Sequence, residues 1–386
     1  MGQHKTLIGL NLSVFLMMLG VGMIVAILPG RIIDFTGSGA SVGYLASAFA
    51  LSYLVLQVPI GNLSDRLGIK WFLFAGYVLC FAAGVLYNFS NSASLIFLGR
   101  IIQGAGEAPI WALAPALLSI QYPNSKGKVM GIYNASIHIG LTFGPLLGIL
   151  VLKVWTGNQA FLFYALVCLV GAMITLFSIG KTDKNELAVK EKVDFSKVLV
   201  LMSKGSTFAV LVGIMLYGAG YGIFVTNIPA FLIGVKGFDP TFIAVYFSLF
   251  YIGISLSQVI GGYLSDKMGR EIFMIIGLLM TALGIALFPG LSQPFISVIL
   301  TLASLGLGIF YIASMALLNE LVPNSLKGTI SGAYFLFWGI GYFFGPMIMG
   351  RLGELPGFSK GFYIFSITLV LEAAVLMVFY RKAKLV

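Results

Sequence analysis

The sequence predicts an all-α membrane protein of twelve transmembrane helices, arranged as two parallel six-helix repeats around a central cavity. Three observations predict this fold: a composition suited to lipid, apolar runs of membrane-spanning length, and motifs of the first half that recur in the second. Of the 386 residues, 59% are hydrophobic and only 9% are charged, whereas a soluble domain carries about 25% charged residues. Most of the surface is therefore expected to face hydrocarbon.

The apolar runs between charged residues and Gly, Pro or Asn breaks give the twelve spans, since about 20 apolar residues cross a bilayer as a helix. They are predicted at residues 7–30, 41–61, 71–89, 94–121, 129–152, 159–180, 205–233, 240–261, 272–290, 295–321, 329–352 and 359–380. The first run is longer than a signal-peptide core and lacks a small-x-small cleavage site, so we expect it to be retained.

One long polar stretch, 181–204, divides the spans six and six. It predicts an N-terminal bundle over 1–180, a cytoplasmic linker over 181–204 and a C-terminal bundle over 205–386. With both termini and the linker on one side, that side carries 17 of the 23 Lys and Arg residues and the other side carries 5, which leaves Arg100 within a span. The positive-inside rule makes the basic side cytoplasmic. We therefore expect a multi-pass protein of the inner or plasma membrane, whose net charge of +10 reflects topology and not a nucleic-acid partner.

Other functional classes find little support in the sequence. Cys80 and Cys168 lie inside apolar runs, and His4 is far from His138, so neither a disulfide framework nor a metal site is expected. Paired catalytic carboxylates, a nucleophile elbow and a phosphate-binding loop are all missing from the sequence. We therefore expect neither an enzyme nor an ATP-driven pump, no cofactor, and a monomer.

The two halves repeat at an offset of 200–201 residues. GNLSDRLG at 61–68 recurs as GYLSDKMG at 262–269, Pro-Asn-Ser at 123–125 recurs at 323–325, Gly-Pro at 144–145 recurs at 345–346, and Pro29 matches Pro229. Because six is an even number of spans, both copies have the same orientation. Parallel repeats of this kind are typical of transporters whose halves move about a site near the membrane midplane.

The corner after the second span of each repeat carries charged residues and glycines. The first copy contains Gly61, Asp65, Arg66 and Gly68, and the second contains Gly262, Asp266, Lys267, Gly269 and Arg270. Glycine permits a tight turn, and a carboxylate at this boundary can bind a helix N-terminus or a base. One copy alone could be a charged turn that only marks topology, whereas two copies at the same place favour a gate that closes one face of the protein.

These corners are similar to motif A of the major facilitator superfamily, G-x-x-x-D-[RK]-x-G-[RK]-[RK]. The first copy departs from that motif at Ile69, and the second departs at Glu271. The resemblance covers the whole chain, and it implies a twelve-helix transporter.

The fourth span carries Arg100, Gln103, Glu107 and Trp111, at a spacing that places them on one helical face. Charged groups at the centre of a membrane helix cost about 3 kcal/mol each, so we expect them to face a polar cavity or a partner. A carboxylate in such a place favours its neutral form, which suits proton transport. The alternative is a bracing pair of Arg100 and Glu107, although about 10 Å of helical rise separates them. The sequence R-x-x-Q-G resembles motif B of the superfamily.

The fifth span carries a stripe of small residues, Gly140, Gly144, Pro145 and Gly148. Such a stripe permits close helix contact, and packing alone could explain it. It also resembles motif C of the superfamily, which implies antiport and export; Gly131 fits the start of that motif. On the opposite face lie Asn134 and His138, where an imidazole suits proton exchange but could equally be a packing residue.

Aromatic residues in three later spans are candidates for the wall of the cavity, although their spacing also suits ordinary packing. They are Tyr217, Tyr221, Tyr311, Tyr334 and Trp338. Glu372, midway along the last span, is expected to make only a local hydrogen bond.

The resemblance is strongest to the twelve-span drug:proton antiporters. It implies a secondary active transporter that exports small amphipathic or drug-like molecules by proton antiport through alternating access, as in multidrug resistance. One alternative is a proton-coupled symporter that imports a polar metabolite such as a sugar or an organic acid. Another is a membrane receptor or lipid flippase on the same scaffold.

Overall fold

The computed structural model describes residues 2–154, 157–180, 205–322, 327–354 and 359–384. Regular secondary structure in these residues is helical, and twelve helical segments are long and apolar enough to cross a membrane. The predicted all-α class and the twelve spans are therefore confirmed. The predicted linker, 181–204, lies outside the described residues.

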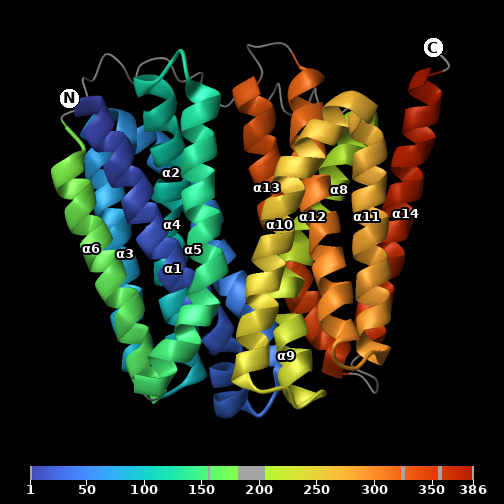
Figure 1. Ribbon diagram of the computed structural model, residues 1–386, viewed down its shortest axis with the longest axis horizontal. Coiled ribbons are helices and arrows are strands. Elements are labelled where there is room, and N and C mark those ends of the chain that lie inside the picture. The colour runs from blue at the N-terminus through green and yellow to red at the C-terminus, as the bar shows by residue number, and fades with distance from the viewer. Residues whose placement is uncertain (1, 155–156, 181–204, 323–326, 355–358, 385–386) are drawn as a thin grey trace. The chain divides into compact units, whose positions relative to one another are not determined.

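The first six spans each form one helix (Figure 1): α1 (Gly2–Thr36), α2 (Tyr44–Leu67), α3 (Ile69–Asn88), α4 (Ala93–Gln121), α5 (Lys126–Val154) and α6 (Ala160–Ser178). The next six form α8 (Gly205–Val225), α9 (Asn227–Gly234), α10 (Pro240–Met268), α11 (Arg270–Leu287), α12 (Phe295–Glu320), α13 (Lys327–Glu354) and α14 (Ser359–Lys384). Several helices continue past the predicted apolar runs; α1, for example, extends beyond the predicted 7–30 at both ends.

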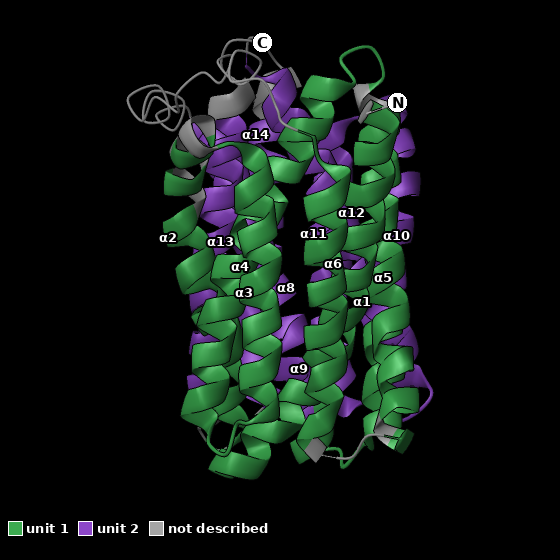
Figure 2. Ribbon diagram, turned by 90° about the vertical axis from the view of Figure 1, so that its left-hand side faces the viewer, with its two compact units in different colours: residues 1–190, 232–248 green, residues 191–231, 249–386 purple. Residues whose placement is uncertain are grey.

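The chain divides into two compact units (Figure 2), one of residues 1–190 and 232–248, the other of residues 191–231 and 249–386. Helices α1–α6 are called the first bundle below. The second bundle consists of α8 and α11–α14 together with residues 249–268 of α10. The domain limits expected from the sequence remain a prediction.

The two motif A corners have the same backbone geometry. A single residue joins α2 to α3 and α10 to α11, and in both cases it is a glycine: Gly68 with φ +91° and Gly269 with φ +103°. Side chains strongly disfavour this backbone region, whereas glycine adopts it readily. The repeat seen in the sequence therefore corresponds to a repeated one-residue turn.

The motif C stripe packs α5 directly against α1. A Cβ atom added to Gly140 would lie 2.7 Å from the carbonyl oxygen of Phe15, and one added to Gly144 would lie 2.9 Å from Gly22 Cα. Gly148 faces the side chain of Met23, whose Cγ would lie 3.0 Å from an added Cβ. The stripe therefore allows two helix backbones to touch, as expected for small residues in membrane helices.

The second bundle repeats this contact between α13 and α8. Gly341 abuts the backbone of Met215, Gly345 abuts Ala219, and a Cβ on Gly222 would lie 3.1 Å from Pro346 Cδ. These residues are the equivalents, 200 or 201 positions later, of those that join α5 to α1. The duplication is thus preserved in helix packing as well as in sequence.

The seventh span differs from the prediction of one continuous helix, because it is broken at Thr226 into α8 and α9. Pro229 explains the break, since proline has no N–H to donate to the residue four positions earlier, Val225, and its ring crowds that carbonyl. The break places Pro229 in the first turn of α9, where a helix makes no such bond.

Side chains stabilise the break. Thr226 donates its hydroxyl to Gly222 O at 2.7 Å, and Asn227 Nδ2 donates to Pro346 O on α13 at 3.2 Å. The matching proline of the first half, Pro29, lies inside the continuous helix α1. The prolines repeat in sequence, but the helix break belongs to the second half only.

We predict the orientation of this fold from two cysteine variants. Both native cysteines are fully buried, so labelling reports the introduced residue. Lys128→Cys, exposed at the start of α5, should react with a membrane-impermeant maleimide only after cells are permeabilised, and Val235→Cys should react in intact cells. Labelling of position 128 from outside would contradict the expected cytoplasmic termini.

Candidate functional site

The polar residues of α4 form one continuous chain of hydrogen bonds in the first bundle. Arg100 Nη1 donates to Gln103 Oε1 at 3.0 Å, and Gln103 Nε2 donates to Glu107 Oε1 at 2.8 Å. Trp111 Nε1 donates to Glu107 Oε2 at 3.0 Å. We call these four residues the α4 network. The predicted shared face is therefore present, and both carboxylate oxygens of Glu107 accept a hydrogen bond.

Neighbouring helices hold the Arg100 end of this network. Arg100 Nε donates to Leu45 O of α2 at 3.1 Å, and its guanidinium carbon lies 4.8 Å from the centre of the Phe49 ring. Tyr87 of α3 donates its hydroxyl to Gln103 Oε1 at 2.8 Å. Because Gln103 links the two charged residues, the strained direct pair of Arg100 and Glu107 is not needed.

Burial differs along the network. Arg100, Gln103 and Glu107 are 5%, 0% and 3% exposed, whereas Trp111 is 36% exposed. The carboxylate is thus buried in protein, whereas the indole that donates to it is partly exposed.

The second bundle shows that the fold does not require this network. Gly76 meets Gly106 between α3 and α4, and Gly277 meets Gly306 between α11 and α12, which aligns α12 with α4 at an offset of 200. The equivalents of Arg100, Gln103 and Glu107 are Leu300, Ala303 and Leu307, all of them buried. The same packing positions are filled by apolar side chains in the second bundle and by the hydrogen-bonded polar side chains of the α4 network in the first.

The five predicted aromatic residues gather in the second bundle. Ring centres lie 6.3 Å apart for Tyr217 and Tyr221, 5.6 Å for Tyr217 and Tyr311, and 6.0 Å for Tyr311 and Tyr334. Trp338 lies 6.3 Å from Tyr221. We call these five residues the aromatic cluster. Tyr311, its member on α12, is the equivalent of Trp111.

The two other proton or cavity candidates of the first bundle, Asn134 and His138, lie on α5 and not on α4. Asn134 is exposed there and His138 is half-buried. No group of three or more His, Cys, Asp or Glu in the described part of the chain could hold a metal ion.

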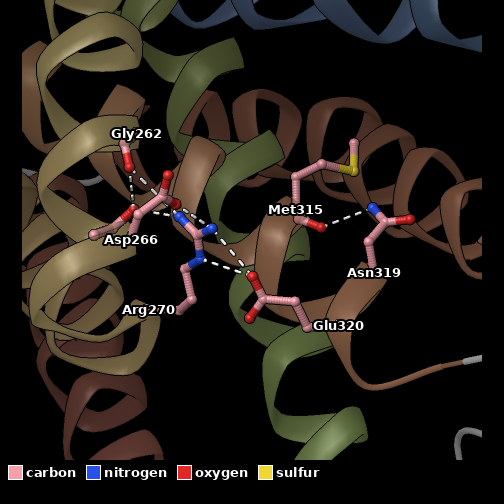
Figure 3. Close-up of polar contacts among 7 residues, drawn as sticks. Gly262, Asp266, Arg270, Met315, Asn319 and Glu320 are labelled. Atoms are coloured by element: carbon pink, nitrogen blue, oxygen red, sulfur yellow. Dashed lines mark hydrogen bonds and ion pairs between the residues drawn. The ribbon is translucent and has the colours of Figure 1, made fainter. Parts of the chain in front are cut away.

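The second motif A corner is an ion-pair cluster (Figure 3). Arg270 Nη2 pairs with Asp266, and its Nε and Nη2 atoms both donate to Glu320 Oε1 of α12 at 3.1 Å. Arg270 Nη1 donates to Ser265 Oγ at 2.7 Å. One guanidinium therefore links the α10–α11 turn to the end of α12. The side chains of Asp65 and Arg66, in the first copy, lie outside the described residues.

We expect Arg270→Gln to loosen this corner, because it removes the charge shared by two carboxylates. These carboxylates are more than half exposed, so a loss of about 1 kcal/mol is expected, which raises local amide exchange roughly fivefold. Hydrogen–deuterium exchange of residues 265–272 measures it. Lys267→Gln is the matched control, since Lys267 bonds Tyr263 of its own helix. An equal effect in both variants would contradict a specific role for Arg270.

Sequence reasoning missed several partners of these clusters. Tyr87, Leu45 and Phe49 come from other helices than α4, and Glu320 lies 50 residues from Arg270. Motif spacing within one span carries no signal for such contacts. The sequence does carry a signal for Glu320, because this carboxylate lies three residues before the repeated Pro-Asn-Ser sequence.

Comparisons with known proteins agree with the duplicated helical fold. The sequence model of the Major Facilitator Superfamily matches residues 10–247 and 210–385. An uncharacterized MFS-type transporter of Methanocaldococcus jannaschii is 26% identical over 92% of this chain and 93% of its own. Multidrug resistance protein 1 of Bacillus subtilis is 23% identical over 99% and 98%. Quinolone resistance protein NorA of Staphylococcus aureus is 22% identical over 99% of both chains.

Solved structures with the same fold include the nucleoside transporter NupG, with a TM-score of 0.82 and 16% identity over 97% of this chain and 99% of that one. A bacterial homologue of the human lysosomal transporter Spinster has a TM-score of 0.82 and 17% identity over 98% and 97%. At these identities the likeness describes the fold.

Twelve membrane-capable helices, two bundles with repeated packing and the matched relatives define a multi-pass membrane transporter of small molecules, not an enzyme. The chain belongs to the major facilitator superfamily.

Proposed function

We propose that this transporter exports small amphipathic or drug-like molecules in exchange for protons, by alternating access. The observation that carries the proposal is the contrast between the bundles: Arg100, Gln103 and Glu107 in one, and Leu300, Ala303 and Leu307 in the other. Apolar residues suffice for packing at these positions of the second bundle, and buried charges are costly in a membrane. We therefore infer that the charged residues of the α4 network serve transport and not stability.

Glu107 is the proposed proton carrier. An ionised carboxylate accepts hydrogen bonds at both oxygens, which suits donation from Gln103 and Trp111. A proton on Oε2 would compete with the indole N–H of Trp111 for that oxygen. Binding of a proton would then release the half-exposed Trp111, whereas its loss would draw the indole back. Proton binding is thereby coupled to a side chain that a substrate can touch.

The substrate class is proposed from the chemistry of the two clusters. An ionised Glu107 beside an accessible indole would attract an organic cation with a flat apolar part. The aromatic cluster of the second bundle offers rings and hydroxyl groups of the same character. Two relatives, a multidrug resistance protein and a quinolone resistance protein, support drug-like molecules as the substrate class.

Transport by the purified protein in proteoliposomes tests the proposal. With an acidic interior corresponding to the outer face of the cell, a fluorescent amphipathic cation should accumulate inside and stop accumulating when a proton ionophore is added. Accumulation that ignores the ionophore would reject proton antiport. Gradient-driven uptake of a sugar or a nucleoside in the opposite orientation would favour the symporter instead.

A further inference from the structure

Glu372 is a buried carboxylate that the α4 network does not include. It lies on α14 of the second bundle and is 6% exposed. Its Oε1 atom is buried and has no hydrogen-bond partner among the described residues. The local hydrogen bond expected from the sequence is therefore wrong for this oxygen.

The carboxyl group occupies the space that a glycine of α8 leaves open. A Cβ atom added to Gly213 would lie 3.3 Å from Glu372 Oε1 and 2.8 Å from Phe310 Cζ of α12. On this side the carboxyl group thus faces a helix backbone and a phenyl ring. Neither supplies a charge to the carboxylate.

Charged groups on the helices around Glu372 lie near the helix ends. Those with described side chains are Arg270 and Glu271 at the start of α11, Glu320 at the end of α12, Arg351 near the end of α13, and Lys360 at the start of α14. The titratable tyrosines are Tyr217 and Tyr221 of α8, Tyr311 of α12, Tyr334 and Tyr342 of α13, and Tyr363 and Tyr380 of α14. Gly277 of α11 packs on Phe310. Glu271 precedes Gly277 by six residues, so its backbone is about 9 Å from that contact along the axis of α11.

The first bundle fills the equivalent place without a carboxylate. The counterparts of Glu372, Gly213 and Leu278 are Gly171, Ser13 and Tyr77, at offsets of 200 or 201. There the ring of Tyr77 fills the space beside Gly171, and its hydroxyl donates to Ser13 Oγ at 3.0 Å. At this place in the first bundle the two hydroxyl groups are thus paired with each other, whereas the Oε1 atom of Glu372 in the second bundle has no hydrogen-bond partner among the described residues.

An isolated carboxylate anion is costly in such an environment. A divalent metal ion would need several oxygen ligands, and the described residues provide no such group. A proton neutralises the carboxylate without further ligands. From this geometry we propose that Glu372 is a second proton-binding site, and that it holds a proton in the packing described here.

Infrared spectroscopy of the purified full-length protein tests this proposal without any transport, so its outcome is independent of the proposed function. The parent at neutral pH should show protonated carboxylic-acid absorption with slow deuterium exchange, and Glu372→Gln should lose the part of it that one carboxyl group contributes. Ser366→Ala is the matched control on α14, because it removes a buried hydroxyl bond to Ala282 and no carboxyl group. A band unchanged in Glu372→Gln would overturn the proposal.

Dicyclohexylcarbodiimide, an apolar reagent that modifies protonated carboxyl groups, tests whether the proton is on Glu372. The acid proton moves to a carbodiimide nitrogen, the carboxyl oxygen bonds to the central carbon, and rearrangement gives a stable N-acylurea that retains the mass of the reagent. Mass spectrometry should find this adduct on Glu372 in the parent and in Glu107→Gln, at least severalfold less of it at alkaline pH, and none on position 372 in Glu372→Gln. Modification that does not fall as the pH rises would contradict a protonated Glu372.

Discussion

Glu107→Gln is expected to abolish the pH-driven accumulation of an amphipathic cation in inverted membrane vesicles. Glutamine keeps the size of the side chain but fixes it in a neutral state, so no proton can be exchanged at this position. One pH unit is worth about 1.4 kcal/mol for each proton, or tenfold in concentration. With a gradient of about two units and one proton exchanged for each substrate, the parent should approach about 100-fold accumulation and the variant about onefold.

Binding of the cation should weaken in Glu107→Gln, because the charge that attracts it is lost, but it should not be abolished as accumulation is. The amide oxygen of glutamine can still accept one of the two hydrogen bonds, from Gln103 or from Trp111. Downhill exchange and ligand-induced thermal stabilisation are therefore expected to persist. This split separates a coupling residue from one needed only for folding, because a folding defect would remove both.

Asp34→Asn is the matched control for that experiment. Asp34 lies at the end of α1, its side chain is 64% exposed, and it pairs with Arg31 at 3.5 Å. We expect accumulation in this variant to equal that of the parent. If Glu107→Gln concentrated the cation as well as the parent does, Glu107 would not be the proton site, and His138 would be the next candidate.

Gly144→Ala is expected to destabilise the first bundle by about 3 kcal/mol, the upper part of the range for an overpacked core. The added Cβ would lie 2.9 Å from Gly22 Cα and 2.9 Å from Met23 N. These are backbone atoms of α1, which cannot turn aside as a flexible side chain can. One of the two helices would have to move, which disturbs the contact that small residues provide in membranes.

Gly131→Ala on the same helix is the matched control. A Cβ atom at Gly131 meets nothing within 4 Å, and alanine favours a helix over glycine by about 1 kcal/mol. Stability should therefore be unchanged or slightly higher. A thiol-reactive dye measures the unfolding temperature, because Cys80 and Cys168 are fully buried until the protein unfolds. Equal losses in the two variants would show that the stripe does not set the contact with α1.

The sequence was sufficient for the number of spans and for their duplication. Apolar length predicts a span almost directly, because the bilayer has a fixed thickness. The break at Thr226 was not predicted, although Pro229 is visible in the sequence. Proline is tolerated inside α1 at Pro29, so the residue type alone does not decide between a continuous and a broken helix; the Asn227 bond to Pro346, 119 residues away, contributes as well.

The candidate site was predicted only in part, because some of its contacts form within one helix and others form between helices. Helical periodicity places Arg100, Gln103 and Glu107 on one face, since that depends only on the turn of a single helix. It could not reveal that Tyr87 and Leu45 complete the network, because those contacts depend on how α3 and α2 pack against α4. Nor could spacing show that Glu372 faces Gly213, which is a property of the packed second bundle.

The one-residue corners at Gly68 and Gly269 have a consequence for how the chain enters the membrane. With a single residue between α2 and α3, and again between α10 and α11, the first helix of each pair cannot be released into the bilayer while the second waits in water. Each pair is expected to integrate as a helical hairpin, so that the ribosome must deliver all of residues 44–88, or all of residues 240–287, before either helix of the pair settles.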